Sequence, residues 1–279
     1  MSDLDPYMIR AHVPDFADIA EQYAQDSEHV RDIHDCELDI AYGEGEREEL
    51  DVFWPQGHSS GLPIHIFVHG GYWRANAKDD YSFVANTIVE SGAIAIIIDY
   101  DLMPDTRMEV LIDQVRNAAK WVRQNGEKLG GDTSQVTASG HSAGAHLASY
   151  LQLQGVDEVD EPDTGVSRLL LLSGIYDLQP IRNSFLQEEI SLTEEEATSW
   201  SPITCDASAD INIELAVGAL ETAPFHNDMK QFAKTISGAG GQVSSATLAE
   251  EDHMTIVRSL GESGTECSQL LMKCIHEEY

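Results

Sequence analysis

The stretch SQVTASGHSAGAHLASYL, residues 134–151, joins two different patterns through one short turn. Its first part alternates like a strand, and its last part, from Ala143 onward, is rich in residues that favour a helix. Between them stands G-H-S-A-G, whose glycines let the backbone approach itself closely at a sharp strand-to-helix turn. The stretch therefore predicts a serine, Ser142, held on a strained turn at the end of a strand.

A second pentapeptide with the same spacing, GHSSG, occupies residues 57–61. Pro55 precedes it and Leu62-Pro63 follows it, so no helix can leave this serine. We therefore expect Ser59 to be a loop residue, and we expect Ser142 alone to occupy the strand-turn-helix motif.

Strand patterns and helical patterns alternate along the rest of the chain. Strands are expected at 49–54, 64–69, 93–99, 134–140, 168–174, 211–218 and 242–249. Helices are expected from 16 to 30, at 79–92, 108–126, 143–154, 185–200 and 225–240, and over most of the chain after residue 253. This alternation predicts an α/β protein with a mostly parallel central sheet flanked by helices. We expect a single domain over residues 1–279, with cap elements at 1–35 and about 182–200.

The charge balance is strongly acidic. The 279 residues include 49 Asp and Glu but only 16 Lys and Arg, which gives a net charge of −33. Such a chain is repelled by nucleic acid and by anionic membranes, so neither is expected as a partner. No apolar run reaches the roughly 18 residues of a membrane span, and no signal peptide is visible, so we expect a cytoplasmic protein. The four cysteines lack metal-ligand spacing, and a homodimer remains open.

The stretch HGGYW, residues 69–73, directly follows an expected strand. Paired glycines at such a place let backbone N–H groups turn toward a carbonyl oxygen without interference from side chains. Together with the N–H of Ala143, at the positive end of the following helix, this loop predicts a site that binds an oxyanion.

A serine becomes a nucleophile only when a base takes its proton, so a histidine must reach Ser142. His253 follows the last expected strand, where this architecture places its base. The acid is sought after the preceding strands: Glu221 is favoured because it stands at the edge of a strand, with Asp228 second and Asp177 third. His141 adjoins the serine and is expected to pack within the turn.

With these residues in place, the chain resembles the arylformamidase (kynurenine formamidase) branch of the α/β-hydrolases, close to the hormone-sensitive-lipase-type esterases. The resemblance covers about residue 7 to the region of His253. It rests on HGGYW (69–73), DYDLMPDTRMEVLIDQVRNAAKWV (99–122), GHSAGAHLA (140–148) and LSGIYDL (172–178), with VPDF (13–16) and AYGEGEREELDVFWP (41–55).

The resemblance implies an α/β-hydrolase fold and a Ser-His-acid mechanism through an acyl-enzyme, with no metal and no organic cofactor. The implied catalytic residues are Ser142, His253 and Glu221, although the family usually has Asp as the acid. The implied oxyanion donors are Gly71, Tyr72 and Ala143. The residues expected at the substrate pocket are Trp73, Tyr176 and His141. A small ester is the first expected substrate, a formamide such as N-formylkynurenine the second, and a non-catalytic binding protein a minor alternative.

Overall fold

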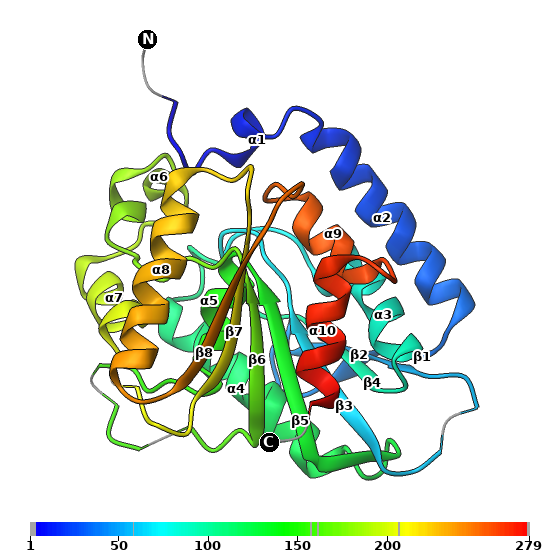
Figure 1. Ribbon diagram of the computed structural model, residues 1–279. Coiled ribbons are helices and arrows are strands. Elements are labelled where there is room, and N and C mark those ends of the chain that lie inside the picture. Colours follow the sequence, from blue (N-terminus) through cyan, green and yellow to red (C-terminus); the bar gives the residue numbers. More distant parts are fainter. Residues whose placement is uncertain (1–3, 58, 157, 161, 206, 278–279) are drawn as a thin grey trace.

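The computed structural model describes residues 4–57, 59–156, 158–160, 162–205 and 207–277, so His58 of the first pentapeptide lies outside the described residues. All its strands form one eight-stranded sheet in the order β1-β2-β4-β3-β5-β6-β7-β8 (Figure 1). Strands β1 and β2 are antiparallel to their neighbours, and the strands from β4 to β8 in this order run parallel. The strands are β1 Asp35–Ala41, β2 Glu49–Trp54, β3 Leu62–Val68, β4 Ile94–Ile98, β5 Gly131–His141, β6 Val166–Leu172, β7 Asn212–Gly218 and β8 Gln242–Leu248.

Helices cover both faces of this sheet (Figure 1). One face carries α3, α9 and α10, with α2 outside them, and the other carries α4, α5 and α8. The helices are α1 Ile9–His12, α2 Phe16–Ile33, η1 Lys78–Val84, α3 Ala85–Glu90, α4 Met108–Asn125, α5 Ala143–Ser149, η2 Pro180–Asn183, α6 Gln187–Ile190, α7 Glu194–Ser199, η3 Pro202–Thr204, α8 Ala223–Gly238, α9 Thr255–Gly261 and α10 Glu266–His276. The predicted α/β class and mostly parallel sheet are confirmed.

Besides short helical turns such as α1, three segments differ from the sequence expectation in type or continuity. The segment expected as one helix at 79–92 is a 3₁₀ helix, η1, followed by the short α3. The segment expected as a helix at 185–200 is two short helices, α6 and α7, because Ser191 adopts left-handed backbone angles and Thr193 starts a new capping box. Strand β1 was not expected. It is an edge strand with most of its side chains exposed, so its sequence lacks the apolar pattern by which a buried strand is recognised.

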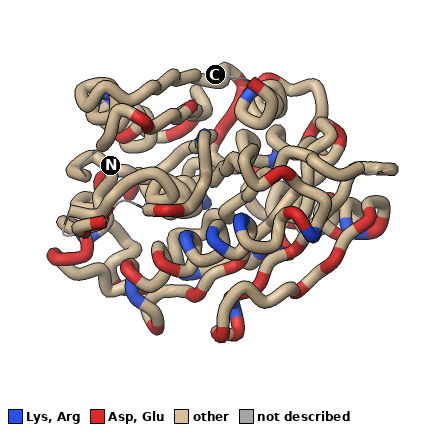
Figure 2. Tube along the Cα trace, turned by 90° about the horizontal axis from the view of Figure 1, so that it is seen from below, with Lys and Arg blue, Asp and Glu red and all other residues tan. Residues whose placement is uncertain are grey.

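The parallel strands end at one edge of the sheet, and this common edge positions the candidate site. Every residue of β4 is apolar and buried, whereas β3 and β5 bury a polar group in which His65 hydrogen-bonds to Thr137 and Ser139. Seen from below, acidic residues lie on helices and loops all around the molecule, and basic residues are fewer (Figure 2). No helix in the described part of the chain has both the length and the apolar composition that a membrane span needs.

Candidate active site

Ser142 stands on a sharp turn between β5 and α5. Its backbone angles are φ 56° and ψ −119°, a conformation that a residue with a side chain rarely adopts. The turn is possible because Gly144 has no side chain: a Cβ there would lie 2.2 Å from the carbonyl oxygen of Val68. In contrast, Ser59 is exposed in the loop between β2 and β3. The expected strand-turn-helix at Ser142 and the expected loop at Ser59 are both confirmed.

Three side chains from three separate loops form a chain of hydrogen bonds. The Nε2 atom of His253 lies 3.0 Å from Oγ of Ser142, and its Nδ1 atom lies 2.7 Å from Oε2 of Glu221. The three side chains are nearly or wholly buried. Since the carboxylate accepts from Nδ1, the Nε2 lone pair faces the serine hydroxyl, and this arrangement can take a proton from Ser142.

The other oxygen of Glu221 is also held. Its Oε1 accepts hydrogen bonds from the backbone N–H of Gly218, at 2.8 Å, and from the hydroxyl of Ser173. These bonds hold the carboxylate in place and fix which of its oxygens faces His253.

The two other acidic candidates lie apart from the histidine. Asp228 lies in α8, where its Oδ2 accepts from the backbone N–H groups of Tyr176, at 2.8 Å, and Asp177, at 3.1 Å. Burial raises the pKa of Asp228 to about 6. The side chain of Asp177 accepts from the backbone N–H of Gln179 at 3.0 Å. Of the three acids, the structure therefore brings only Glu221 to His253.

His141 supports the loop that carries His253. Its Nε2–H donates to the carbonyl oxygen of His253 at 2.8 Å, and the two rings lie 4.7 Å apart. Burial, and next the neighbouring His253, lower the pKa of His141 well below its ordinary value. A neutral ring that donates from Nε2 leaves Nδ1 as an acceptor, and that atom is buried without a partner among the described residues.

The loop after β3 approaches Ser142 from the other side. Gly71 has φ 127°, and a Cβ at this position would lie 2.2 Å from the carbonyl oxygen of Ala75. Tyr72 also has a positive φ, 52°, and its hydroxyl donates to the carbonyl oxygen of Tyr7 at 2.5 Å. Within the described part of the chain, the backbone N–H groups of Gly71, Tyr72 and Ala143 have no hydrogen-bond partner.

A pocket of about 410 Å³ opens beside these groups, a size suited to a small organic molecule. Its walls come from the HGGYW loop, from the Ser142 and His253 turns, and from α1 and α2. Helix α1 contributes Ile9 and Arg10 to the lining, and α2 contributes Phe16, Ala20 and Tyr23.

Two of the expected pocket residues lie elsewhere. Trp73 is wholly buried, and its Nε1–H donates to Nδ1 of His146 at 3.2 Å. Tyr176 is also buried, and its ring stacks on Phe232 with centroids 4.3 Å apart. Neither belongs to the described lining of the 410 Å³ pocket, whereas His141 does. Both rings pack in the core. Sequence alone does not distinguish an aromatic residue of the core from one that lines a pocket.

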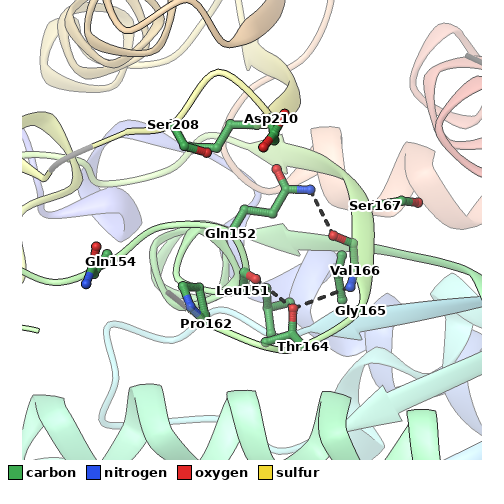
Figure 3. Close-up of a pocket in the computed structure, with 11 residues that line it drawn as sticks. Leu151, Gln152, Gln154, Pro162, Thr164, Gly165, Val166, Ser167, Ser208 and Asp210 are labelled. Atoms are coloured by element: carbon green, nitrogen blue, oxygen red, sulfur yellow. Dashed lines mark hydrogen bonds between the residues drawn. The ribbon is translucent and has the colours of Figure 1, made fainter. Parts of the chain in front are cut away.

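A second cavity, of about 200 Å³, is lined by residues that follow α5 and by the start of β6, and Ser142 is not among its described lining (Figure 3). Its polar side chains serve the backbone: Gln152 donates to the carbonyl oxygen of Val166 at 3.1 Å, and Thr164 donates to that of Leu151 at 2.7 Å. The described lining of this cavity includes one carboxylate, Asp210, and neither a histidine nor a cysteine.

Comparison with known proteins places the chain in a family. A family model described as BD-FAE matches residues 50–204. A kynurenine formamidase from Danio rerio is 32% identical over 273 residues, which cover 96% of this chain and 89% of that protein. The chain belongs to the kynurenine formamidase family. A second member of this family, from Salmo salar, is 31% identical over 253 residues, covering 88% of this chain and 84% of that protein.

Esterases are also related to this kynurenine formamidase family member. The esterase LipQ of Mycobacterium tuberculosis is 35% identical over 154 residues, 52% of this chain and 37% of that protein. Among solved structures, a Silicibacter protein provisionally called a thioesterase superposes with a TM-score of 0.83 at 23% identity, covering 99% of both chains. An esterase of Pyrobaculum calidifontis gives 0.72 at 21% identity, covering 92% of both chains. The α/β-hydrolase fold and a hydrolase activity of the formamidase and esterase kind follow.

Several contributors to the site were not found from sequence. Ser173, which binds Glu221, lies in the LSGIYDL stretch and has a positive φ of 51°, so its motif was the available signal. Asp99, which binds His69 at 2.9 Å, opens the DYDLMP stretch. Arg10, at the pocket, belongs to no pattern that sequence reasoning used.

Proposed function

We propose that this protein is a serine hydrolase of the arylformamidase kind, working through an acyl-enzyme. The observation that carries the proposal is the hydrogen-bonded line from Glu221 through His253 to Ser142, with distances of 2.7 and 3.0 Å. A carboxylate on one ring nitrogen and a serine hydroxyl on the other is the arrangement that makes serine nucleophilic.

In the proposed mechanism, Ser142 Oγ attacks the carbonyl carbon while His253 Nε2 accepts its proton. The negative charge that develops on the carbonyl oxygen is met by the backbone N–H groups of Gly71, Tyr72 and Ala143. The protonated His253, stabilised by Glu221, then gives its proton to the leaving amine or alcohol. Water next attacks the acyl-serine with the same histidine as base, and the free acid and Ser142 are released.

The share of the chain that each relative matches favours a formamide substrate over a simple ester. This order is the reverse of the one expected from sequence. The relatives named kynurenine formamidase match 83–96% of the chain, whereas the esterase LipQ matches 52%.

The pocket supports this order. Arg74, at its wall, pairs with Glu189. Arg10 is exposed at the pocket, its guanidinium lies 5.1 Å from the Phe16 ring centroid, and no carboxylate of the described residues pairs with it. A free guanidinium in so acidic a protein suits a substrate that carries a carboxylate, as N-formylkynurenine does.

Carboxylesterase activity is the second candidate, supported by the esterase relatives. The test compares kcat/KM for N-formylkynurenine with that for p-nitrophenyl acetate and butyrate, using Ser142→Ala as the control. Faster turnover of the esters would place carboxylesterase activity first. If a fluorophosphonate probe does not label Ser142, the hydrolase proposal fails and the fold serves binding instead.

A further inference from the structure

His69 lies behind the oxyanion loop with its side chain wholly buried. Its ring stacks between Tyr100, at 4.3 Å between centroids, and Tyr81, at 5.8 Å. With both faces covered by rings, its two nitrogens are its only polar contacts, and each has one partner.

Both partners are hydrogen-bond acceptors. Nδ1 lies 2.8 Å from the carbonyl oxygen of Gly70, which carries no proton, so Nδ1 must donate. Nε2 lies 2.9 Å from Oδ1 of Asp99. That same oxygen accepts from Nη2 of Arg47 at 2.7 Å and from the backbone N–H of Tyr100 at 3.0 Å, so it is an acceptor for all its neighbours and donates to none of them. Nε2 must therefore donate as well.

A neutral imidazole has only one N–H, so two donated bonds require the cation. We propose that His69 is a buried imidazolium and a positioning residue, which aims the Gly70–Gly71 peptide N–H at the oxyanion formed on Ser142. This inference rests on the hydrolase function proposed above.

The planarity of the peptide bond connects His69 to the reaction. In a trans peptide the Gly70 carbonyl and the Gly71 N–H point in opposite directions. The carbonyl is held by His69 Nδ1 and, at 3.3 Å, by Nδ2 of Asn76. The Gly71 N–H is thereby directed away from His69. The peptide also lies against the nucleophile, since a Cβ on Gly70 would be 3.3 Å from Cβ of Ser142.

The charges around His69 favour its protonated form and the stabilisation of a nearby oxyanion. Asp99, directly after β4, faces its Nε2, and Arg47, from the loop between β1 and β2, neutralises one negative charge there. The facing rings of Tyr81 and Tyr100 offer π faces to a cation, and the hydroxyl of Tyr42 donates to the backbone oxygen of Asp99. Asp99, Arg47 and His69 together carry one net positive charge, close to where negative charge develops.

Nitrogen-15 NMR of histidine-labelled protein at neutral pH tests the protonation state directly. We expect both ring nitrogens of His69, assigned by comparison with His69→Gln, to give signals of protonated nitrogen. His65 is the internal reference for a neutral ring, because burial lowers its pKa to about 3. A bare-nitrogen signal from His69 would overturn the proposal, whether or not the protein proves to be a hydrolase.

Kinetics test the positioning. Asn76→Gly deletes one donor to the Gly70 carbonyl and suits the left-handed φ of 72° at this position. We expect it to lower kcat about 10-fold, and His69→Gln about 100-fold, with KM within about twofold, because the oxyanion contact forms only in the transition state. An unchanged kcat in folded His69→Gln, or a loss confined to KM, would refute the positioning role. If His69→Gln does not fold, the wild-type His69 signals are assigned instead through the contacts of its ring with Tyr81 and Tyr100, and the protonation of the two ring nitrogens then decides.

Discussion

Replacing Glu221 by glutamine should reverse the tautomer of His253. In the wild type, Oε1 of Glu221 accepts from the Gly218 N–H at 2.8 Å, and only Oε2 faces Nδ1 of His253, at 2.7 Å. A glutamine must keep its oxygen toward the Gly218 N–H, so its amide NH₂ meets Nδ1. His253 then accepts at Nδ1 and carries its proton on Nε2, where it can no longer take the proton of Ser142.

The expected loss follows from that tautomer. The corresponding Asp→Asn change in Ser-His-Asp enzymes lowers kcat about 10⁴-fold, which is about 5 kcal/mol of transition-state stabilisation. We expect a loss of about 10³- to 10⁴-fold for Glu221→Gln, measured as kcat on the better of the formamide and ester substrates.

Asp228→Asn is the matched control for this experiment. Both hydrogen bonds of Asp228 go to Oδ2, and an asparagine oxygen has two lone pairs that can accept from the same Tyr176 and Asp177 N–H groups. We expect kcat within about threefold of the wild type, since this side chain does not touch His253. A larger kcat loss in Asp228→Asn than in Glu221→Gln would refute the assignment of the acid.

Three further outcomes are expected. Burial raises the pKa of Asp228 from 3.8 to about 6, so the folded state binds its proton more tightly than the unfolded state, and stability is lost as pH rises through 6. Asp228→Asn should therefore raise the free energy of unfolding in urea by up to about 3 kcal/mol at pH 8 and by less than about 1 kcal/mol at pH 4; equal gains at both would contradict this. Gly71→Ala, whose Cβ would meet the Ala75 carbonyl oxygen at 2.2 Å, should lower kcat at least about 100-fold with an unchanged circular dichroism spectrum, whereas Ser59→Ala should stay within about twofold. Because the net charge is −33, the Tm should rise between 0.1 and 1 M NaCl, as the screening length falls from about 10 to 3 Å; a flat or falling Tm would exclude repulsion as a destabilising force.

Local sequence was sufficient to predict the strand-turn-helix around Ser142. Strand and helix preferences, and the need for glycine where backbones meet, act over a few neighbouring residues. The same local reasoning placed Ser59 in a loop. The alternation of elements also predicted the class of the fold, because parallel strands need helical crossovers between them.

Partners that meet from distant parts of the chain needed the tertiary structure. His253 lies 111 residues from Ser142 in sequence and 3.0 Å from it in space. Sequence left Glu221, Asp228 and Asp177 as competing acids, because all three follow strands that end at the same edge of the sheet. The choice among them depends on which carboxylate oxygen lies within hydrogen-bonding distance of Nδ1 of His253.

The burial of individual side chains also depended on the tertiary structure. Trp73 and Tyr176 were expected at the substrate pocket, but the packing of His146 and Phe232 against them places both in the core. The sequence by itself thus determined the fold class and the place of Ser142 on its strained turn, since both follow from short-range backbone preferences. Only the tertiary structure decided which acid lies beside His253 and which aromatic rings are buried in the core, because hydrogen bonds and burial depend on the distances between segments that the chain brings together on folding.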